Sequence, residues 1–292
     1  MTISKTTNAC HSYGTTTLRG GRLIKWKGQV ASLSPSLGQL VASVSPVALG
    51  RALMVGANRA ATAAVLGSAG LIVTTSSASA ACTPGDPGVY TCSGAMGNTD
   101  GDIDLRGTGN LLDVTVSPST TFNVNAGNAF DLNSNVGATF TNSNPEVTIT
   151  GAVDGIDVYN TVGAIGITTT GDTKGTQNIG ISAINANANG TSLTINAATT
   201  SGGLNGIRTF NSGDGALEIK TTGTTTGSTY EGIYAFMSNT ASTGDLTINA
   251  ANTEGGTNGI YAKNSGTGAL SITTTGTTTG NGTSYPNSGI YA

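Results

Sequence analysis

Histidine is almost absent from this sequence: the single histidine, His11, lies near the amino terminus, as does the only tryptophan, Trp26. The later part of the chain therefore lacks the base of Ser–His–Asp and Cys–His mechanisms and a histidine ligand for zinc. Charged residues make up only 9% of the sequence, against about 25% in typical soluble proteins. No glycine-rich phosphate-binding motif joins a strand to a helix. We expect no cofactor and assign no catalytic or metal-binding residue.

Charge is unevenly distributed along the chain. Residues 1–80 carry seven basic groups and no Asp or Glu, whereas residues 81–292 carry five basic and all 15 acidic groups, a net charge of −10. Proteins bind nucleic acid by neutralising phosphates with Lys and Arg, so we expect no nucleic-acid binding by the second segment. The chain is thus predicted to consist of two different parts.

The first part has the features of a secretory signal. An apolar run over positions 60–73 follows Arg59 and precedes the small residues Ala78-Ser79-Ala80. This order predicts a helical signal segment with cleavage between Ala80 and Ala81. The run is shorter than the about 20 residues of a membrane-spanning helix. A leader covering residues 1–80 is unusually long for a signal peptide. Either the protein has an extended signal that starts at Met1, or translation starts at Met54 and the signal has an ordinary length.

Two cysteines flank a short polar loop directly after the predicted cleavage position. Cys82 and Cys92 enclose nine residues that include Pro and Gly. Such a loop closes easily, and a disulfide persists in an oxidising compartment, which agrees with export. A metal site is the alternative, although two cysteines without a histidine are a poor ligand set. We expect a disulfide within an N-terminal cap over residues 81–100.

The remainder of the chain is repetitive. The dipeptide Gly-Ile recurs at nearly even intervals, at Gly155, Gly180, Gly206, Gly232, Gly259 and Gly289. Between these dipeptides lies an apolar triplet such as Leu193-x-Ile195, and two forms of the triplet alternate, so that the repeats occur in pairs. The apolar residues alternate with period two among strand-forming Thr, Ile and Val, and Gly, Asn and Ser occupy the connections.

A repeat of about 26 residues cannot bury its short strands alone and has to stack on its neighbours. We therefore expect residues 101–292 to form an all-β solenoid, a parallel β-helix of about seven coils. A β-propeller is a weaker alternative because its blades need four strands in about 40 to 50 residues. A disordered linker would lack the fixed period of Ile and Leu. Outward ladders of identical side chains are expected, with Thr168–Thr170 over Thr221-Thr222 over Thr273–Thr275, and with Asn196 two coils from Asn249.

Three groups of residues are candidates for a site. Asp154 and Asp157, with Asp172 and Lys174, could line one face, as the acid and base carboxylates of polysaccharide lyases or hydrolases do. The tyrosines that follow Gly-Ile could stack as an exposed stripe, which would stabilise the rod or contact sugar or protein; they are Tyr234, Tyr261 and Tyr291.

A third group resembles the start of a calcium loop. Asp100, Asp102 and Asp104 alternate along the chain, but Leu105 stands where an EF-hand has its glycine. We expect these aspartates to be a solvated start of the solenoid.

The leader ending in SASA, the segment CTPGDPGVYTCSGA and the Gly/Thr/Asn-rich repeats with GI and LTI strands resemble an autotransporter (type V secretion) passenger of alphaproteobacterial type. The resemblance implies a right-handed β-helix at the cell surface or outer membrane, often adhesive or self-associating. It also implies export by the Sec machinery and a carboxy-terminal β-barrel translocator. No row of barrel strands is present in this sequence, so we expect an amino-terminal, truncated piece of such a protein.

The leading hypothesis is a non-enzymatic secreted or surface passenger that mediates adhesion or self-association. Its expected partners are a host or neighbouring-cell surface, other copies of itself, or carbohydrate. We expect the protein to be secreted to the periplasm. If a barrel follows, it is expected at the cell surface or outer membrane; without a barrel, it is expected to stay in the periplasm or to be extracellular. Two alternatives stay open: a β-helical carbohydrate-active enzyme, and a truncated fragment without function.

Overall fold

The computed structural model describes residues 12–17, 23–28, 62–66, 71–75, 81–93, 102–117, 121–282 and 288–292. The chain divides into two compact units, Met1–Ser76 and Ser77–Ala292. Within these ranges the regular elements are all strands, so none of the described residues forms a helix that could cross a membrane.

The first unit contains two antiparallel strand pairs. β1 (Ser12–Thr17) pairs with β2 (Leu23–Gly28), and β3 (Thr62–Leu66) pairs with β4 (Leu71–Thr75). β3 and β4 fall in the region where the sequence predicts a helical signal segment. The rest of that region, with Met54 and Ala80, lies outside the described residues. The signal peptide and its cleavage between Ala80 and Ala81 therefore stay predictions.

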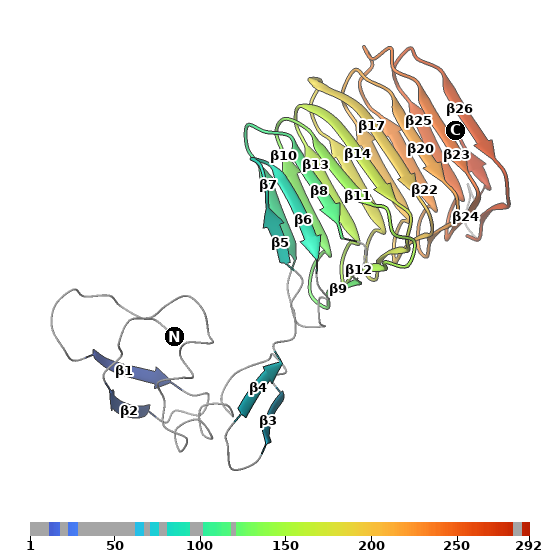
Figure 1. Cartoon of the computed structure of the whole chain (residues 1–292). Coiled ribbons are helices and arrows are strands. Elements are labelled where there is room, and N and C mark those ends of the chain that lie inside the picture. The colour runs from blue at the N-terminus through green and yellow to red at the C-terminus, as the bar shows by residue number, and fades with distance from the viewer. Residues whose placement is uncertain are drawn as a thin grey trace. The chain divides into compact units, whose positions relative to one another are not determined.

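The second unit is a parallel β-solenoid in which each coil contributes one strand to each of three sheets (Figure 1). Sheet 1 has eight strands: β7 (Ile103–Gly107), β10 (Phe130–Ser134), β13 (Ile156–Asn160), β16 (Ile181–Asn185), β19 (Ile207–Asn211), β22 (Ile233–Met237), β25 (Ile260–Asn264) and β28 (Ile290–Tyr291). Sheet 2 has nine: β5 (Ala81–Pro84), β6 (Val89–Ser93), β8 (Leu112–Val116), β11 (Ala138–Asn142), β14 (Gly163–Thr169), β17 (Gly190–Ala197), β20 (Leu217–Thr221), β23 (Leu246–Ala250) and β26 (Leu270–Thr274). Sheet 3 has seven: β9 (Phe122–Asn123), β12 (Ile149–Gly151), β15 (Thr173–Gly175), β18 (Thr200–Gly202), β21 (Thr224–Gly227), β24 (Asn252–Gly255) and β27 (Thr278–Gly280).

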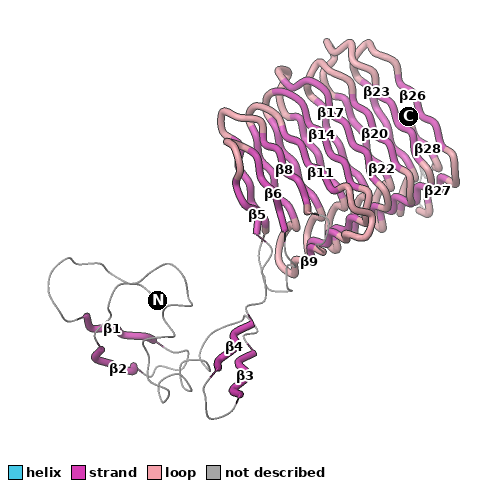
Figure 2. The backbone as a smooth tube through the Cα atoms, viewed as in Figure 1, coloured by secondary structure: helices cyan, strands magenta, loops and turns pink. Residues whose placement is uncertain are grey.

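Three consecutive strands make one coil, from coil 1 (β7, β8, β9) to coil 7 (β25, β26, β27), and β28 begins an eighth. Neighbouring coils pair in parallel register, so that a residue lies beside its equivalent in the next repeat, as Phe130 does with Ile156. Figure 2 shows the strands of successive coils side by side along the rod. The prediction of an all-β parallel solenoid with about seven coils is confirmed.

The recurring apolar residues form ladders inside the rod. In coils 3 to 7 the isoleucine after each Gly faces inward on sheet 1, and Ile156, Ile207 and Ile260 are fully buried. Leu193 and Ile195 of the apolar triplet do the same on sheet 2. The glycine before each isoleucine lies where two coils approach closely: a Cβ on Gly206 would lie 2.7 Å from the carbonyl oxygen of Gly232. The recurring Gly-Ile dipeptide therefore serves both coil stacking and the core.

Polar residues also point inward, which the sequence did not predict. Asn160, Asn185 and Asn211 are fully buried where the chain turns from sheet 1 to sheet 2. The Asn160 Nδ2 donates to the Asn185 Oδ1 at 2.9 Å, and the Asn211 Nδ2 donates to the carbonyl oxygen of Gly215 at 2.9 Å. Buried polar groups need hydrogen-bond partners. The asparagine side chains provide them for backbone carbonyl groups that are buried in these turns.

The expected outward threonine ladder is partly wrong. Thr169 and Thr221 do lie two coils apart, but both are buried and alternate with Ala197 and Ala250 in one inward ladder. Side chains alternate along a strand, so inward Ile167 places Thr168 outside and Thr169 inside. Asn196 and Asn249 do lie two coils apart, as predicted, but Lys220 of the coil between them pairs with both, so they form no ladder of identical side chains.

A threonine ladder lines the inner side of sheet 3, and it gives a stability prediction. The Thr200 Oγ1 is buried and has no hydrogen-bond partner, whereas the Thr253 Oγ1 donates to Thr278 Oγ1 at 3.0 Å. Thr200→Val removes only an unsatisfied hydroxyl, so we expect its free energy of unfolding to rise by about 1 kcal/mol. The matched variant Thr253→Val loses a hydrogen bond, so we expect no rise in its free energy of unfolding. Urea titration of both variants measures the difference, and equal changes in the two would contradict the prediction.

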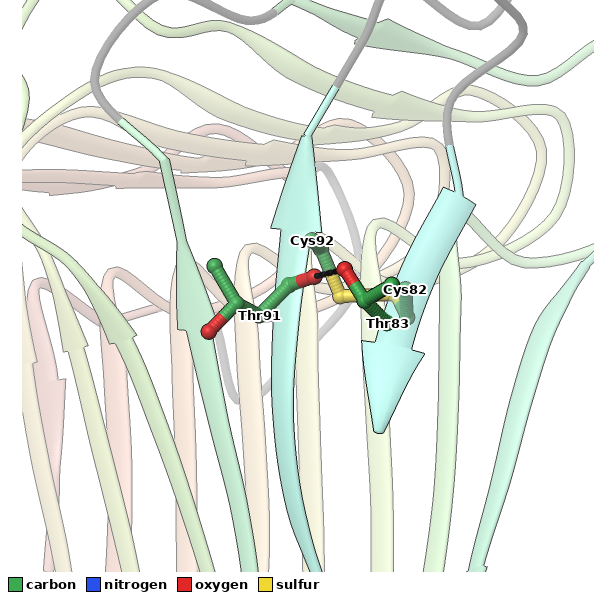
Figure 3. The surroundings of a disulfide bond; sticks show 4 residues. All are labelled: Cys82, Thr83, Thr91 and Cys92. Atoms are coloured by element: carbon green, nitrogen blue, oxygen red, sulfur yellow. Dashed lines mark hydrogen bonds between the residues drawn. A yellow bond between two sulfur atoms is a disulfide. The ribbon is translucent and has the colours of Figure 1, made fainter. Parts of the chain in front are cut away.

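A hairpin caps one end of sheet 2. β5 and β6 pair antiparallel, and β6 pairs in parallel with β8 of coil 1. A disulfide joins Cys82 to Cys92 across the hairpin, and Thr83 Oγ1 donates to the carbonyl oxygen of Thr91 at 3.2 Å (Figure 3). The predicted disulfide is confirmed, and it leaves no free thiolate for the metal alternative. Residues 94–101 lie outside the described residues, so the cap boundary at residue 100 stays a prediction.

Candidate surface on sheet 1

The three outer faces of the solenoid differ in composition. Outward residues of sheets 2 and 3 are mostly Thr, Ser and Asn, as in the pairs Thr141–Thr168 and Ser201–Thr226. On sheet 1 they form two columns along the rod. The aspartate–tyrosine column consists of Asp104, Asp131, Asp157, Ser182, Arg208, Tyr234, Tyr261 and Tyr291. The phenylalanine column consists of Arg106, Asn133, Tyr159, Ile184, Phe210, Phe236 and Lys263.

Aromatic rings gather on this face from coil 5 to β28, the first strand of coil 8. Tyr234 and Tyr261 stack with ring centroids 4.9 Å apart and planes 3° apart, and Tyr261 stacks on Tyr291 at 5.2 Å. Phe210 contacts both Tyr234, at 5.4 Å, and Phe236, at 5.9 Å. Offset or tilted pairs at such distances stabilise one another beyond the area that they bury. The predicted tyrosine stack is therefore confirmed, and two phenylalanines extend it.

Two cations lie on the same rings. The Arg208 guanidinium is 4.9 Å from the centroid of the Phe210 ring, and the Lys263 ammonium is 5.5 Å from that of Phe236. Both distances fall within the range of cation–π attraction. Burial raises the pKa of the Tyr234 phenol, and nearby Tyr261 and Glu231 add to the rise, so this residue stays protonated and can donate a hydrogen bond. Coils 5 to 7 of sheet 1 thus present an aromatic, basic surface.

The opposite half of the face is acidic. Asp104, Asp131 and Asp157 occupy equivalent positions in coils 1, 2 and 3. Arg106 forms an ion pair with Asp104 at 2.6 Å and a longer one with Asp131 at 3.7 Å. Burial raises the pKa of Asp131 and of Asp157, and the charge of Asp157 raises that of Asp131 further. Like charges stacked in register repel one another, so this column costs stability in the isolated chain.

Asp154 lies next to this column, at the corner before β13. It is only 6% exposed, and its Oδ1 accepts a hydrogen bond from the backbone N–H of Ile179 at 2.7 Å. Burial raises its pKa to about 6, and the neighbouring Asp157 adds to the rise. Asn128 and Asn258 play the same part in other coils, since each accepts from a backbone N–H of the next coil at 3.1 Å. An uncharged amide would therefore suffice at position 154.

Of the four candidate catalytic residues, the structure brings only Asp154 and Asp157 together. Asp154 and Asp157 lie close enough for their charges to interact. Asp172 and Lys174, in contrast, flank inward Thr173 and so face outward from sheet 3. The expectation that all four line one face is wrong, because β13, β14 and β15 belong to three different sheets and the chain turns two corners between the two pairs. Of the three alternating aspartates, Asp100 lies outside the described residues, and Asp104 begins the acidic column.

In the described ranges no three His, Cys, Asp or Glu side chains lie together in a way that could hold a metal ion. No protein-family model, curated protein or solved structure matches this chain. The functional assignment therefore depends on the surfaces themselves. Sheet 1 differs from the two other faces, because it carries both the aromatic cluster and the stacked carboxylates.

Asparagine in place of Asp154 is expected to stabilise the protein. A folded-state pKa of about 6, above the usual 3.8, means that the folded chain binds the proton more tightly than the unfolded chain. Stability therefore falls as the pH rises from about 4 to 7. Asp154→Asn keeps the acceptor for Ile179 and avoids the buried charge, so we expect a gain of about 1 to 2 kcal/mol at pH 7.

Urea unfolding of Asp154→Asn between pH 4 and 8 measures this gain. The variant should lose part of the pH dependence but not all of it, because Asp131 and Asp157 shift in the same direction. Asp172→Asn, an exposed change on sheet 3, serves as the control and should leave the profile unaltered. If the free energy of unfolding of Asp154→Asn depended on pH as that of the wild type does, the prediction would be contradicted.

Proposed function

We propose that this chain is the right-handed β-solenoid of an exported, non-enzymatic autotransporter-type passenger, which mediates adhesion or self-association through sheet 1. The observation that supports the proposal is the concentration of outward aromatic side chains on one face. Tyr159, Phe210, Tyr234, Phe236 and Tyr261 all lie on sheet 1, and Tyr159 is exposed while the other four are partly exposed. Aromatic side chains that gather on one solvent-accessible face usually mark an interaction site.

A bead assay tests the proposal. Beads coated with the full chain should aggregate or attach to bacterial cells, and Tyr234→Thr with Tyr261→Thr should reduce this at least tenfold, since aromatic residues dominate interface energies. The matched control replaces Asn196 and Asn249 by Thr on sheet 2. If the control and the tyrosine variant behave alike, adhesion through sheet 1 is refuted. Circular dichroism confirms that both variants keep their strands.

A carbohydrate-active enzyme is the second candidate, supported by the interacting pair Asp154 and Asp157. Glycosidases need one protonated and one ionised carboxyl group, and the pKa of about 6 keeps a fraction of Asp154 protonated near neutral pH. Assays on a panel of acidic polysaccharides test for turnover. If turnover exists, Asp154→Asn and Asp157→Asn should each abolish it. If no substrate is cleaved, the adhesive function is favoured.

A further inference from the structure

The charges of sheet 1 are segregated along the rod. Coils 1 to 3 carry Asp104, Asp131 and Asp157 against a single cation, Arg106. Coils 5 to 7 carry Arg208 and Lys263, and no outward carboxylate lies on their sheet-1 strands. One face therefore has an acidic half and a basic, aromatic half. The sheet-1 surface of one chain is complementary to that of another chain turned end for end.

We propose that sheet 1 binds sheet 1 of a second copy of this chain, face to face, with the two solenoid axes antiparallel. This inference depends on the proposed function and names the partner. A twofold axis parallel to the strands, between coils 4 and 5, places each column over the same column of the second copy. Coil 3 then faces coil 6, and coil 4 faces coil 5. The interface is the same patch on both copies, as a closed twofold dimer requires.

This arrangement matches the side chains coil by coil. In the phenylalanine column, Ile184 faces Phe210 and Tyr159 faces Phe236 of the second copy. In the aspartate–tyrosine column, Asp157 faces the Tyr234 hydroxyl and lies one coil from Arg208 of the second copy. Asp131 likewise lies diagonally from Lys263. The parallel arrangement would instead place acidic half over acidic half, which electrostatic complementarity disfavours.

The stacked aspartates favour a second copy over a glycan as the occupant. The basic, aromatic half would fit any ligand that presents carboxylates, including a uronic acid polymer. Sheet 1 already carries such carboxylates, one in each of coils 1 to 3, at the strand spacing of about 4.8 Å. The repulsion among these carboxylates is relieved when cations of a second copy lie within one coil of them or diagonally across from them.

The size of the face is that of a weak interface. Seven five-residue strands and the two-residue β28 give about 600 Å² for each copy, or about 1,200 Å² in total. That area lies at the lower end of specific interfaces, the range of weak and transient complexes. Weak pairs repeated over many copies can hold two surfaces together.

Sedimentation velocity of the full chain, from 1 μM to 1 mM, tests the proposal. The wild type should form a dimer that 0.5 M NaCl weakens at least tenfold. Arg208→Glu with Lys263→Glu should abolish the dimer, and so should Asp131→Lys with Asp157→Lys. An equimolar mixture of these two double variants should associate again, because each presents the charges that the other needs. Glu218→Lys with Lys220→Glu on sheet 2 is the control and should dimerise like the wild type.

The mixture guards against misfolding, since misfolded variants would not re-form a stoichiometric dimer. A wild type that stays monomeric at 1 mM, or two double variants that do not associate when mixed, would overturn the proposal. Binding of a polygalacturonate oligosaccharide to a monomeric wild type, lost in the Arg208/Lys263 variant, would also overturn it and identify a glycan as the occupant. If coated beads still attach to cells while the chain is monomeric, the proposed adhesion stands and only this inference fails.

Discussion

Replacing Ile207 by alanine should lower the free energy of unfolding by about 3 to 4 kcal/mol. Ile207 is fully buried in a central coil, where it pairs with Ile181 below and Ile233 above. The truncation loses the transfer free energy of the removed carbons and leaves a cavity that stacked neighbours cannot close. Each coil contacts only its two neighbours, so a defect in coil 5 weakens both of its interfaces.

Ile184→Ala is a matched control for this prediction. Ile184 belongs to the adjacent coil and has the same side chain, but it faces outward from sheet 1 and is only partly buried. Its truncation should cost less than about 1 kcal/mol. Urea unfolding followed by circular dichroism measures both variants. Equal losses would mean that Ile207 does not belong to a packed interior.

Removal of the disulfide should cost about 2 to 3 kcal/mol and should act at one end of the rod only. Cys82 and Cys92 are separated by ten positions, and closing such a loop restricts the unfolded chain by about this amount. In the double variant Cys82→Ser with Cys92→Ser, we expect β5 and β6 to separate from β8. Distant coils keep their own neighbours and should stay folded.

Hydrogen exchange measured by mass spectrometry resolves this effect by segment. Amides of β6 and β8 should exchange faster in the double variant, while those of β17 and β20 should not change. Adding a reductant to the wild type should reproduce the result, and adding it to the double variant should have no effect. Uniformly faster exchange along the solenoid would contradict a local role of the cap.

The sequence predicted the coil period because Ile and Leu repeat at fixed spacing. It predicted sheets 1 and 2, whose strands hold the Gly-Ile and Leu-x-Ile patterns. Sheet 3 has no such pattern, since its strands are as short as two to four residues and their inward residues include Thr173, Thr200 and Thr225. Hydrophobic periodicity cannot detect a core ladder made of threonine.

The candidate surface was predicted only in part, for a related reason. The tyrosine stack follows from Gly-Ile-Tyr repeated at the coil period. The acidic column was missed because Asp104, Asp131 and Asp157 have different neighbours, although each is separated from the next by one coil length. The buried asparagines also keep this spacing, from Asn160 to Asn185 to Asn211. In a solenoid, the spacing of polar residues therefore carries as much information as that of apolar ones.

The alternation of Thr169, Ala197, Thr221 and Ala250 in one inward ladder has a consequence for how such a chain can grow. Thr221 lies between two smaller alanines, and close packing makes the volume at one level depend on the next. Inserting a single coil would bring two threonines or two alanines together, whereas inserting two coils preserves the alternation. The unit of lengthening is therefore the pair of coils, and related chains of other lengths should differ by even numbers of coils.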